Sequence, residues 1–249
     1  MQNVTISIVS HNQGRIMIQL LDRLAKYSTS IKKVIVTHNI TESIYCPNNK
    51  FPFEVFEIQN KTPKGFASNH NQAFGFCDSD FFCVMNPDID IISEPFQGLK
   101  DCFQDRSVAI VAPLIKNTKG QVEDTARYFP TPFGLAKKLL LNQNGAFHAD
   151  SKEVIIYPDW LGGMFLLFES KKYKNLNGFD ESYHLYYEDV DICLRAWKHG
   201  FKVILCKHNE VYHDARRSSH SDLIYMKWHL TSLLRFFIKH FWRFPNKVI

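Results

Sequence analysis

A carboxylate just past a buried strand is suited to bind a divalent cation, and the chain has such a place. Asp80 to Met85 is a nearly continuous apolar run, typical of a strand in the centre of a sheet, and Asn86-Pro87-Asp88 follows it. The proline fixes this turn, and Mg²⁺ and Mn²⁺ prefer hard oxygen ligands that they share with diphosphate oxygens. The segment therefore suits a cation that bridges a diphosphate, with Asp90 as an alternative ligand. An ordinary turn is the alternative without a metal.

A second group of carboxylates is denser. Five acidic residues lie within twelve positions, interleaved with aromatic residues: Asp180, Glu181, Glu188, Asp189 and Asp191. From Asp189 onward apolar residues recur at helical spacing, so we expect a loop that delivers Glu188 and Asp189 to the first turn of a helix. The unpaired amides and the dipole of a helix favour negative charge there. Simple helix capping would explain the same carboxylates.

The order of residues around this group is more specific than its charge. The run Gly178, Phe179, Asp180, Glu181, Glu188, Asp189, Asp191 and Arg195 resembles the GFDE…YEDVDLxxR signature of inverting GT-A glycosyltransferases of family 2, and in particular their bacterial rhamnosyltransferase-like branch. The resemblance implies that Asp189, of the pair Glu188-Asp189, is the catalytic base. Asn86-Pro87-Asp88 resembles a variant of the family's DxD motif, which implies that Asp88 binds Mg²⁺ or Mn²⁺.

The N-terminal third predicts the start of a parallel sheet. Val4 to Ser10 is rich in β-branched residues, Arg15 to Tyr27 has helical apolar spacing, and Lys33 to Thr37 suits a second strand. Such a unit places ligands at the carboxyl ends of its strands, and the absence of GxGxxG argues against a dinucleotide fold. The resemblance implies an α/β, GT-A (Rossmann-like) fold with a mixed, mainly parallel central sheet flanked by helices.

Several loops at these strand ends are expected to contact the donor nucleotide. Lys64 to Phe74 is similar to the family's GFAxAxNxG segment, in which Gly65 permits an unusual backbone angle. His38-Asn39 stands where the family has an acidic run; these residues could substitute by hydrogen bonding, so the nucleotide's identity stays open, and a polar turn is the alternative for His38. The expected donor contacts are Ser10, His11, Asn12, His38, Asn39, Gly65, Phe66, Asn69, Asn86 and Asp88.

The acceptor side is expected near a strand from Trp160 to Phe168. Glycines at its start allow a ligand to approach the backbone closely, and the family has a similar aromatic and glycine segment beside the sugar. The expected acceptor contacts are Trp160, Gly162, Gly163 and Asp159, although core packing would also explain Trp160. The resemblance also implies that His213 is a second metal ligand, for which a structural histidine is the alternative.

The C-terminal segment predicts a helix with basic and aromatic residues. Lys227, Thr231, Arg235, Lys239 and Arg243 recur every fourth residue from Leu223 to Phe244, and apolar residues fill much of the remainder. Such an amphipathic helix could lie on an anionic membrane surface, or pack on the domain or on a second subunit in a homodimer. We expect a GT-A domain at residues 1–222 and this helix at 223–249.

Composition sets broad limits. The 45% hydrophobic and 22% charged content is ordinary for a globular protein, and the net charge of +5 is compatible with an anionic ligand or a membrane surface. The six cysteines form no CxxC pair, so we expect reduced thiols. The sequence starts directly with a strand pattern, so we expect no signal peptide. Together these features predict a cytoplasmic protein or a peripheral one at the inner face of the cell membrane. The modest charge, concentrated in the tail, argues against nucleic-acid binding.

These observations favour an inverting, metal-dependent transfer of a sugar from a nucleotide-sugar donor to a surface polysaccharide or lipid-linked glycan acceptor, with rhamnose suggested by the resemblance alone. A nucleotidyltransferase is a rival, but residues 10–15 lack its glycine-rich basic loop. The second rival is a non-catalytic relative that binds a nucleotide or a sugar. The altered His38-Asn39 segment keeps this alternative open, whereas the intact Glu188-Asp189 pair and Asp88 argue against it. The sequence leaves the sugar, the acceptor, the linkage and the oligomeric state open.

Overall fold

The computed structural model describes residues 3–27, 29–41, 50–131, 134, 153–213, 223–241, 243–245 and 247. Within these residues nine strands form one sheet in the order β3-β2-β1-β4-β10-β6-β11-β5, with β8 paired to β11. The strands are β1 (Val4–Ser10), β2 (Ile31–His38), β3 (Glu54–Gln59), β4 (Phe81–Met85), β5 (Ile89–Asp90), β6 (Val108–Asn117), β8 (Ile155–Ile156), β10 (Phe165–Glu169) and β11 (Lys202–His213).

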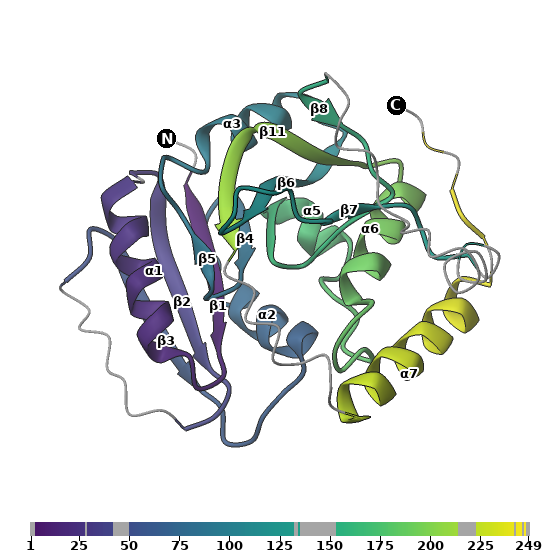
Figure 1. Cartoon of the computed structure of the whole chain (residues 1–249), viewed down its shortest axis with the longest axis horizontal. Helices are drawn as coiled ribbons and strands as arrows, with labels where there is room; N and C mark the ends of the chain where they lie inside the picture. The colour runs from purple at the N-terminus through teal and green to yellow at the C-terminus, as the bar shows by residue number, and fades with distance from the viewer. Residues whose placement is uncertain are drawn as a thin grey trace.

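The longest ladders of the sheet are parallel. These ladders join β1 to β2 and β4, β2 to β3, and β6 to β11, whereas β10 runs antiparallel between β4 and β6. The predicted mixed, mainly parallel sheet is therefore confirmed (Figure 1).

Helices cover both faces of the sheet, as predicted (Figure 1). They are α1 (Gly14–Tyr27), α2 (Phe66–Phe74), α3 (Gln97–Asp101) with a 3-10 turn at Cys102–Gln104, α5 (Ser170–Asn175), α6 (Glu188–Lys198) and α7 (Leu223–His240). One apolar layer packs α1 and α3 against alternate residues of β1 such as Ile6 and Ile8. The other layer packs α2, α5 and α6 against the opposite face. Alternation along each strand thus supplies both cores.

One predicted strand, from Trp160 to Phe168, differs from the structure. The expected strand from Trp160 to Phe168 is divided into β9 (Trp160–Leu161), which pairs with β7 (Ala126–Arg127) in a separate two-stranded sheet, and β10. The turn at Gly163 separates them, so the glycines lie between two strands rather than at the start of one. Strand β11 in turn is continuous from Lys202 to His213, because a bulge between Cys206 and Glu210 keeps both of its parts paired with β6.

Helix α7 lies against α6 and the loop that precedes α6 (Figure 1). Phe236 of α7 is fully buried in a small cluster with Tyr187, Val190 and Leu194. The predicted amphipathic character of this helix is not confirmed, because its outward-facing side also carries apolar residues such as Leu234 and Ile238. The predicted domain boundary at residue 222 lies outside the described residues.

Candidate active site

Asp189 is held at the N-terminus of α6 by backbone amides. Its Oδ1 accepts a hydrogen bond from the amide of Val190 at 2.8 Å, and its Oδ2 accepts one from the amide of Gly163 at 3.0 Å. Burial raises the pKa of Asp189 to about 6, while these amides and the positive charge of Arg127 act in the opposite direction. A carboxylate with a pKa near neutrality and a fixed direction can take a proton from a hydroxyl group.

Glu188 has a different environment from its neighbour. It is buried, and its Oε2 has no hydrogen-bond partner among the described residues. Burial, and next the charge of Asp189, raise the pKa of Glu188 well above its usual value. Glu188 therefore stays protonated to higher pH than Asp189, so Asp189 is the carboxylate of the pair that is more readily ionised and available to accept a proton.

Asp88 and His213 meet although 125 positions separate them in the chain. His213 ends β11, and its Nε2 lies 3.3 Å from Oδ2 of Asp88, while its Nδ1 lies 2.9 Å from Oε2 of Glu123. Burial of the ring opposes protonation, but the two carboxylates outweigh it and raise the pKa of His213. The predicted pair of metal ligands is thus brought together, with a carboxylate on the far side of the imidazole that the sequence did not indicate.

These residues fit a divalent cation that takes its remaining ligands from other molecules. The Oδ1 atom of Asp88 is buried without a hydrogen-bond partner in the described part of the chain, so it is available as a ligand. A histidine that donates its other ring proton to a carboxylate, as His213 can to Glu123, is a common metal-ligand arrangement. The described ranges contain no group of three His, Cys, Asp or Glu side chains arranged to hold a metal alone. A cation would therefore need oxygen ligands from a diphosphate and water.

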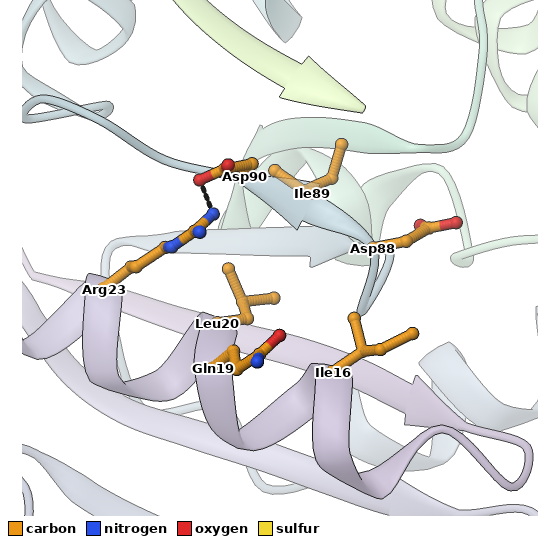
Figure 2. Close-up of a pocket in the computed structure, with 7 residues that line it drawn as sticks. All are labelled: Ile16, Gln19, Leu20, Arg23, Asp88, Ile89 and Asp90. Atoms are coloured by element: carbon orange, nitrogen blue, oxygen red, sulfur yellow. Dashed lines mark ion pairs between the residues drawn. The ribbon is translucent and has the colours of Figure 1, made fainter. Parts of the chain in front are cut away.

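Asp90, the alternative ligand, points to a different partner. Its carboxylate forms an ion pair with Arg23 of α1, and Figure 2 shows Asp88 directed away from that pair. The pocket between α1 and β5 that these residues line has a volume of about 120 Å³. Ligand pockets for small molecules measure roughly 300–1,000 Å³. The structure thus favours Asp88 over Asp90 as the ligand and offers no nucleotide-sized space between α1 and β5.

One turn links the Asp88 loop to the Asp189 carboxylate. The amide of Asn86 donates to the carbonyl oxygen of Met164 at 2.9 Å, and the adjacent Gly163 donates to Asp189. A β-carbon on Gly163 would lie 3.1 Å from the ring of Phe66 and 3.7 Å from Cβ of Asp189, so glycine allows the close contact. The candidate base and the candidate metal ligand therefore lie at the same edge of the sheet, joined by the β9–β10 turn.

The expected donor contacts divide into two groups. Asn39 and Asn69 are buried and bonded inside the protein: Asn60 donates through Nδ2 to both, at 2.9 and 2.7 Å, and Asn39 also bonds to the backbone of Lys64. His38 is buried too, and its Nε2 lies 2.7 Å from Glu57. These side chains hold the loop ends in place.

The loop after β1 is more open. His11 and Asn12 are exposed, and Asn12 has a positive φ of 62°. The Oγ of Ser10 is buried and accepts a hydrogen bond from the amide of Gln13 at the start of α1. Of the expected donor residues at this end, His11 and Asn12 are the ones whose side chains are accessible.

Gly65 and Phe66 lie against the loop that precedes α6, residues 178–187, which we call the acidic loop. The amide of Phe66 donates to the carbonyl oxygen of His184 at 3.1 Å, and a β-carbon on Gly65 would lie 2.4 Å from that oxygen. Asn71 secures the same loop further on, because its amide group bonds to the backbone of Phe179 in both directions, at 2.8 and 3.0 Å. The loop that delivers the candidate base is thus docked on the N-terminal half of α2.

The expected acceptor residues lie beside Arg127. Its guanidinium stacks 5.8 Å from the ring centroid of Trp160, whose Nε1 donates to the carbonyl oxygen of Tyr128 at 3.0 Å. Asp159 is committed to internal contacts, since its Oδ2 accepts from the amide of Phe129 at 2.6 Å and its Oδ1 pairs with Lys247. Trp160 and Arg127 remain partly exposed next to Asp189.

Known structures share this fold. The chain aligns with a solved structure of GalNAc-T7 with UDP, GalNAc and Mn²⁺ at a TM-score of 0.73, with 13% sequence identity, over 96% of this chain and 48% of that chain. At this identity the likeness shows the fold alone, and the chain spans about half the length of that structure. The fold is the GT-A glycosyltransferase fold.

Sequence comparisons identify relatives over nearly the whole chain. Residues 146–220 match a family model described as the N-terminal domain of galactosyltransferase. Rhamnosyltransferase WbbL of Escherichia coli (strain K12) is 25% identical over 244 residues, which cover 94% of this chain and 92% of the relative. The N-acetylglucosaminyl-diphospho-decaprenol L-rhamnosyltransferase of Mycobacterium tuberculosis (strain CDC 1551 / Oshkosh) is 29% identical over 153 residues, covering 57% of this chain and 50% of the relative. The chain is a glycosyltransferase with the GT-A fold, and the relatives that it resembles include rhamnosyltransferases.

Sequence reasoning missed several residues of this glycosyltransferase that hold the candidate site together. Glu123 lies 90 positions from His213, and Asn60 belongs to a short polar loop without a recognisable pattern. On α7, Lys239 and His240 contact Asp191 of α6, from which they are separated by 48 and 49 positions in the chain. An isolated charged residue gives no local signal for a partner at such a distance. The regular spacing of Lys239 in the basic pattern instead suggested an outward-facing position.

Proposed function

We propose that this glycosyltransferase moves a sugar from a nucleotide-diphosphate donor to a glycan or lipid-linked glycan acceptor, with inversion and with help from a divalent cation. The single observation that carries the proposal is the Asp189 carboxylate, fixed by two backbone amides with a pKa of about 6 beside the Asp88 loop. Inversion requires one base that activates the acceptor on the face opposite the leaving group, and Asp189 is a carboxylate of that kind.

In the proposed reaction, Asp189 accepts the proton of the acceptor hydroxyl as its oxygen attacks the anomeric carbon. The amides of Gly163 and Val190 fix the carboxylate in direction, so that little reorganisation is needed. The positive charge of Arg127 favours the ionised form of Asp189. Burial and the charge of Asp189 raise the pKa of Glu188, which favours the neutral form of Glu188 beside the base.

Asp88 and His213 are the proposed ligands of a Mg²⁺ or Mn²⁺ ion, with Asn86 in the same turn. When bound, such an ion stabilises the negative charge of a departing diphosphate. Glu123 would keep the proton on Nδ1 of His213 and leave Nε2 free to bind. The Mn²⁺ in the GalNAc-T7 structure supports a divalent ion in a protein of the same fold.

The identities of donor and acceptor are taken from the relatives. Both rhamnosyltransferase relatives favour rhamnose as the sugar, and the mycobacterial one carries a lipid-linked saccharide in its name. We propose rhamnose on a nucleotide diphosphate as donor, and a lipid-linked or polysaccharide precursor as acceptor. His11 and Asn12, with Gly65 and Phe66, are the proposed donor contacts beside the metal site, and Trp160, Gly162 and Gly163 border the proposed acceptor side.

The test is a thermal-shift panel of UDP, dTDP, GDP and CMP, each with and without Mn²⁺. We expect one nucleotide to raise Tm only when Mn²⁺ is present, because a ligand that binds the folded state alone stabilises it by about 2.7 kcal/mol at a hundred times its dissociation constant. The Asp88→Asn variant should lose the Mn²⁺-dependent part of the shift.

A matched control is Asp90→Asn, which removes a carboxylate from the same loop on the side of Arg23. This variant should keep the Mn²⁺-dependent shift. Equal loss in both variants would contradict the assignment of Asp88, and the absence of any shift in the unmodified protein with all four nucleotides would contradict the proposed donor site.

A surface of α7 supports a contact with lipid. We define the outer stripe as the exposed apolar residues at spacings of three or four along this helix: Leu223, Met226, Leu230, Leu234, Ile238 and Phe241. Residues 223–249 contain no Asp or Glu, and Lys227 is exposed among the outer stripe. We propose an anionic lipid surface as its partner, because apolar insertion and charge attraction then act together. Two copies facing each other would instead bring like charges together.

The predicted basic pattern is only partly available to such a surface. Arg235 bonds to the backbone of Ser182, and Lys239 pairs with Asp180, so both turn toward the acidic loop. Among the described residues no helix has both the length and the apolar character needed to cross a bilayer. Contact through the outer stripe would therefore be peripheral.

A further inference from the structure

Helix α7 packs along the part of the acidic loop that leads into α6. Ser232 donates through Oγ to the carbonyl oxygen of Leu185 at 2.9 Å, and the ring of Trp228 lies 4.6 Å from that of His184. Phe236 is fully buried, with its ring 5.7 Å from the ring of Tyr187. The inner face of α7 thus contacts the three residues 184, 185 and 187 that lead into Glu188.

The same helix reaches the first turn of the catalytic helix. Asp191 lies two residues after Asp189 and is fully buried. Lys239 and His240 both bond to its Oδ1, through Nζ at 2.6 Å and Nε2 at 2.8 Å, and Arg195 bonds to its Oδ2 at 2.7 Å. Two of the three groups that fix this buried carboxylate therefore come from α7.

The backbone before Glu188 needs such support. Tyr186 and Tyr187 both have φ of 69°, in the left-handed region that residues with a side chain rarely adopt. A conformation of this kind persists where the surroundings hold it, and sites of this kind are common next to catalytic groups. The ring of His229 on α7 packs edge-to-face against both tyrosines, with ring centroids 5.5 and 5.3 Å away.

We propose that Lys239 and His240 are positioning residues for sugar transfer: through Asp191 they fix the first turn of α6 and thereby the direction of the Asp189 carboxylate. The proposal rests on the assignment of Asp189 as the base. The predicted boundary at residue 222 would then separate the catalytic helix from the element that positions it, so α7 belongs to the catalytic unit.

The first experiment follows the carboxylate without any substrate. Hydrogen exchange is measured at the amide of Gly163, which donates to Asp189, in the His240→Leu and Lys239→Met variants. We expect exchange at this amide to become about tenfold faster in both, since coupling within such a network commonly amounts to that factor. His240→Gln, which keeps a side-chain N–H, should restore the slow exchange. Lys227→Met, the same change at an exposed position of α7, should have no effect.

A merely structural role of α7 gives a different pattern. Exchange would then rise equally at Phe236 and at Gly163, and His240→Gln would not differ from His240→Leu. Either result would overturn the proposal. The double variant Asp191→Asn with His240→Leu should be no worse than Asp191→Asn alone, whereas additive effects would show that His240 does not act through Asp191.

The second experiment measures turnover with dTDP-rhamnose and a synthetic N-acetylglucosaminyl-diphospho-prenol, with Asp189→Asn as reference. His240→Leu and Lys239→Met should lower kcat about tenfold and leave the KM for dTDP-rhamnose within about twofold, because a misplaced base affects the chemical step. An unchanged kcat in these variants, with Asp189→Asn inactive, would overturn the positioning role alone. Full turnover by Asp189→Asn would instead overturn the assignment of the base.

Discussion

Asp189 and its neighbour Glu188 differ in their ability to take a proton. Both are carboxylates on adjacent residues, yet two backbone amides bond to Asp189, whereas Oε2 of Glu188 is buried without a partner among the described residues. Burial raises the pKa of both groups, and several backbone amides with the positive charge of Arg127 oppose that effect in Asp189, whereas in Glu188 the charge of Asp189 adds to it. This difference in environment, rather than in residue type, is why we propose Asp189 and not Glu188 as the base.

The pKa of Asp189 predicts how activity depends on pH. Because the base must be ionised, kcat/KM should fall about tenfold per pH unit below about 6 and level off above it. The measurement is the pH profile of sugar transfer in the unmodified protein. Asp189→Asn should lower kcat by roughly 10²–10⁴-fold at pH 7.5 and remove this limb. A profile that stays flat down to pH 4.5 would show that another group, or none, accepts the proton.

Glu123 gives a prediction for the metal site. Glu123→Gln keeps the size of the side chain but weakens the bond to Nδ1 of His213, so the Mn²⁺ affinity measured with bound nucleotide should fall roughly 10–100-fold. Glu210→Gln is the matched control, because Glu210 pairs with Lys116 and has no contact with His213. An equal change in both variants would indicate a general effect of charge.

Local patterns in the sequence predicted the positions of Asp88, Glu188 and Asp189 at the ends of their elements, whereas their roles stay predictions. Asp88 follows a buried strand and Glu188-Asp189 opens a helix, and both positions are defined by residues within one or two turns of chain. Glu123 and Asn60 could not be predicted, because each acts on a residue brought near by the sheet rather than by the chain. The separation of Asp90 from Asp88 also needed the structure, since Arg23 draws Asp90 to the other side.

At the scale of elements, the two faces of α7 have different roles. Phe236 is fully buried against α6 and the acidic loop, whereas Leu234, two positions earlier, is 62% exposed. Phe236→Ala should therefore lower the free energy of unfolding by about 3–5 kcal/mol, because it leaves a cavity. Leu234→Ala should change it by less than about 0.5 kcal/mol. Urea unfolding of the two variants measures the difference, and similar values would contradict the packing of α7.

Element types were predicted better than element limits. The spacing of Leu20, Leu21 and Leu24 identified α1, and the β-branched run at Val4 identified β1, because each pattern repeats over several turns or residues. The division between β9 and β10, and the joining of β11 across its bulge, depend on which neighbour each strand pairs with. Pairing partners are set by tertiary contacts and leave no periodic mark in the sequence.

At the scale of the whole molecule, the proposed contact between the outer stripe and an anionic membrane makes a prediction. The unmodified protein should sediment with vesicles that contain phosphatidylglycerol, and less with neutral phosphatidylcholine vesicles, and raised salt should weaken the binding. The double variant Leu234→Glu with Ile238→Glu should lose most of this binding while Tm changes little, since both side chains are exposed. A concentration-dependent dimer that the same variant abolishes, without vesicle binding, would assign the stripe to a second copy.

The contact between α7 and Asp191 forms late in synthesis, because α7 follows α6 in the chain. Asp191 leaves the ribosome 48 residues before Lys239 does. Strand β11, which the sheet needs beside β6, is made between them. A nascent chain that has completed only α6 therefore carries Glu188 and Asp189 without Lys239 and His240, the two α7 residues that bond to Asp191. We expect translation to pass through a stage in which the acidic motif is present but sugar-transfer activity has not yet begun.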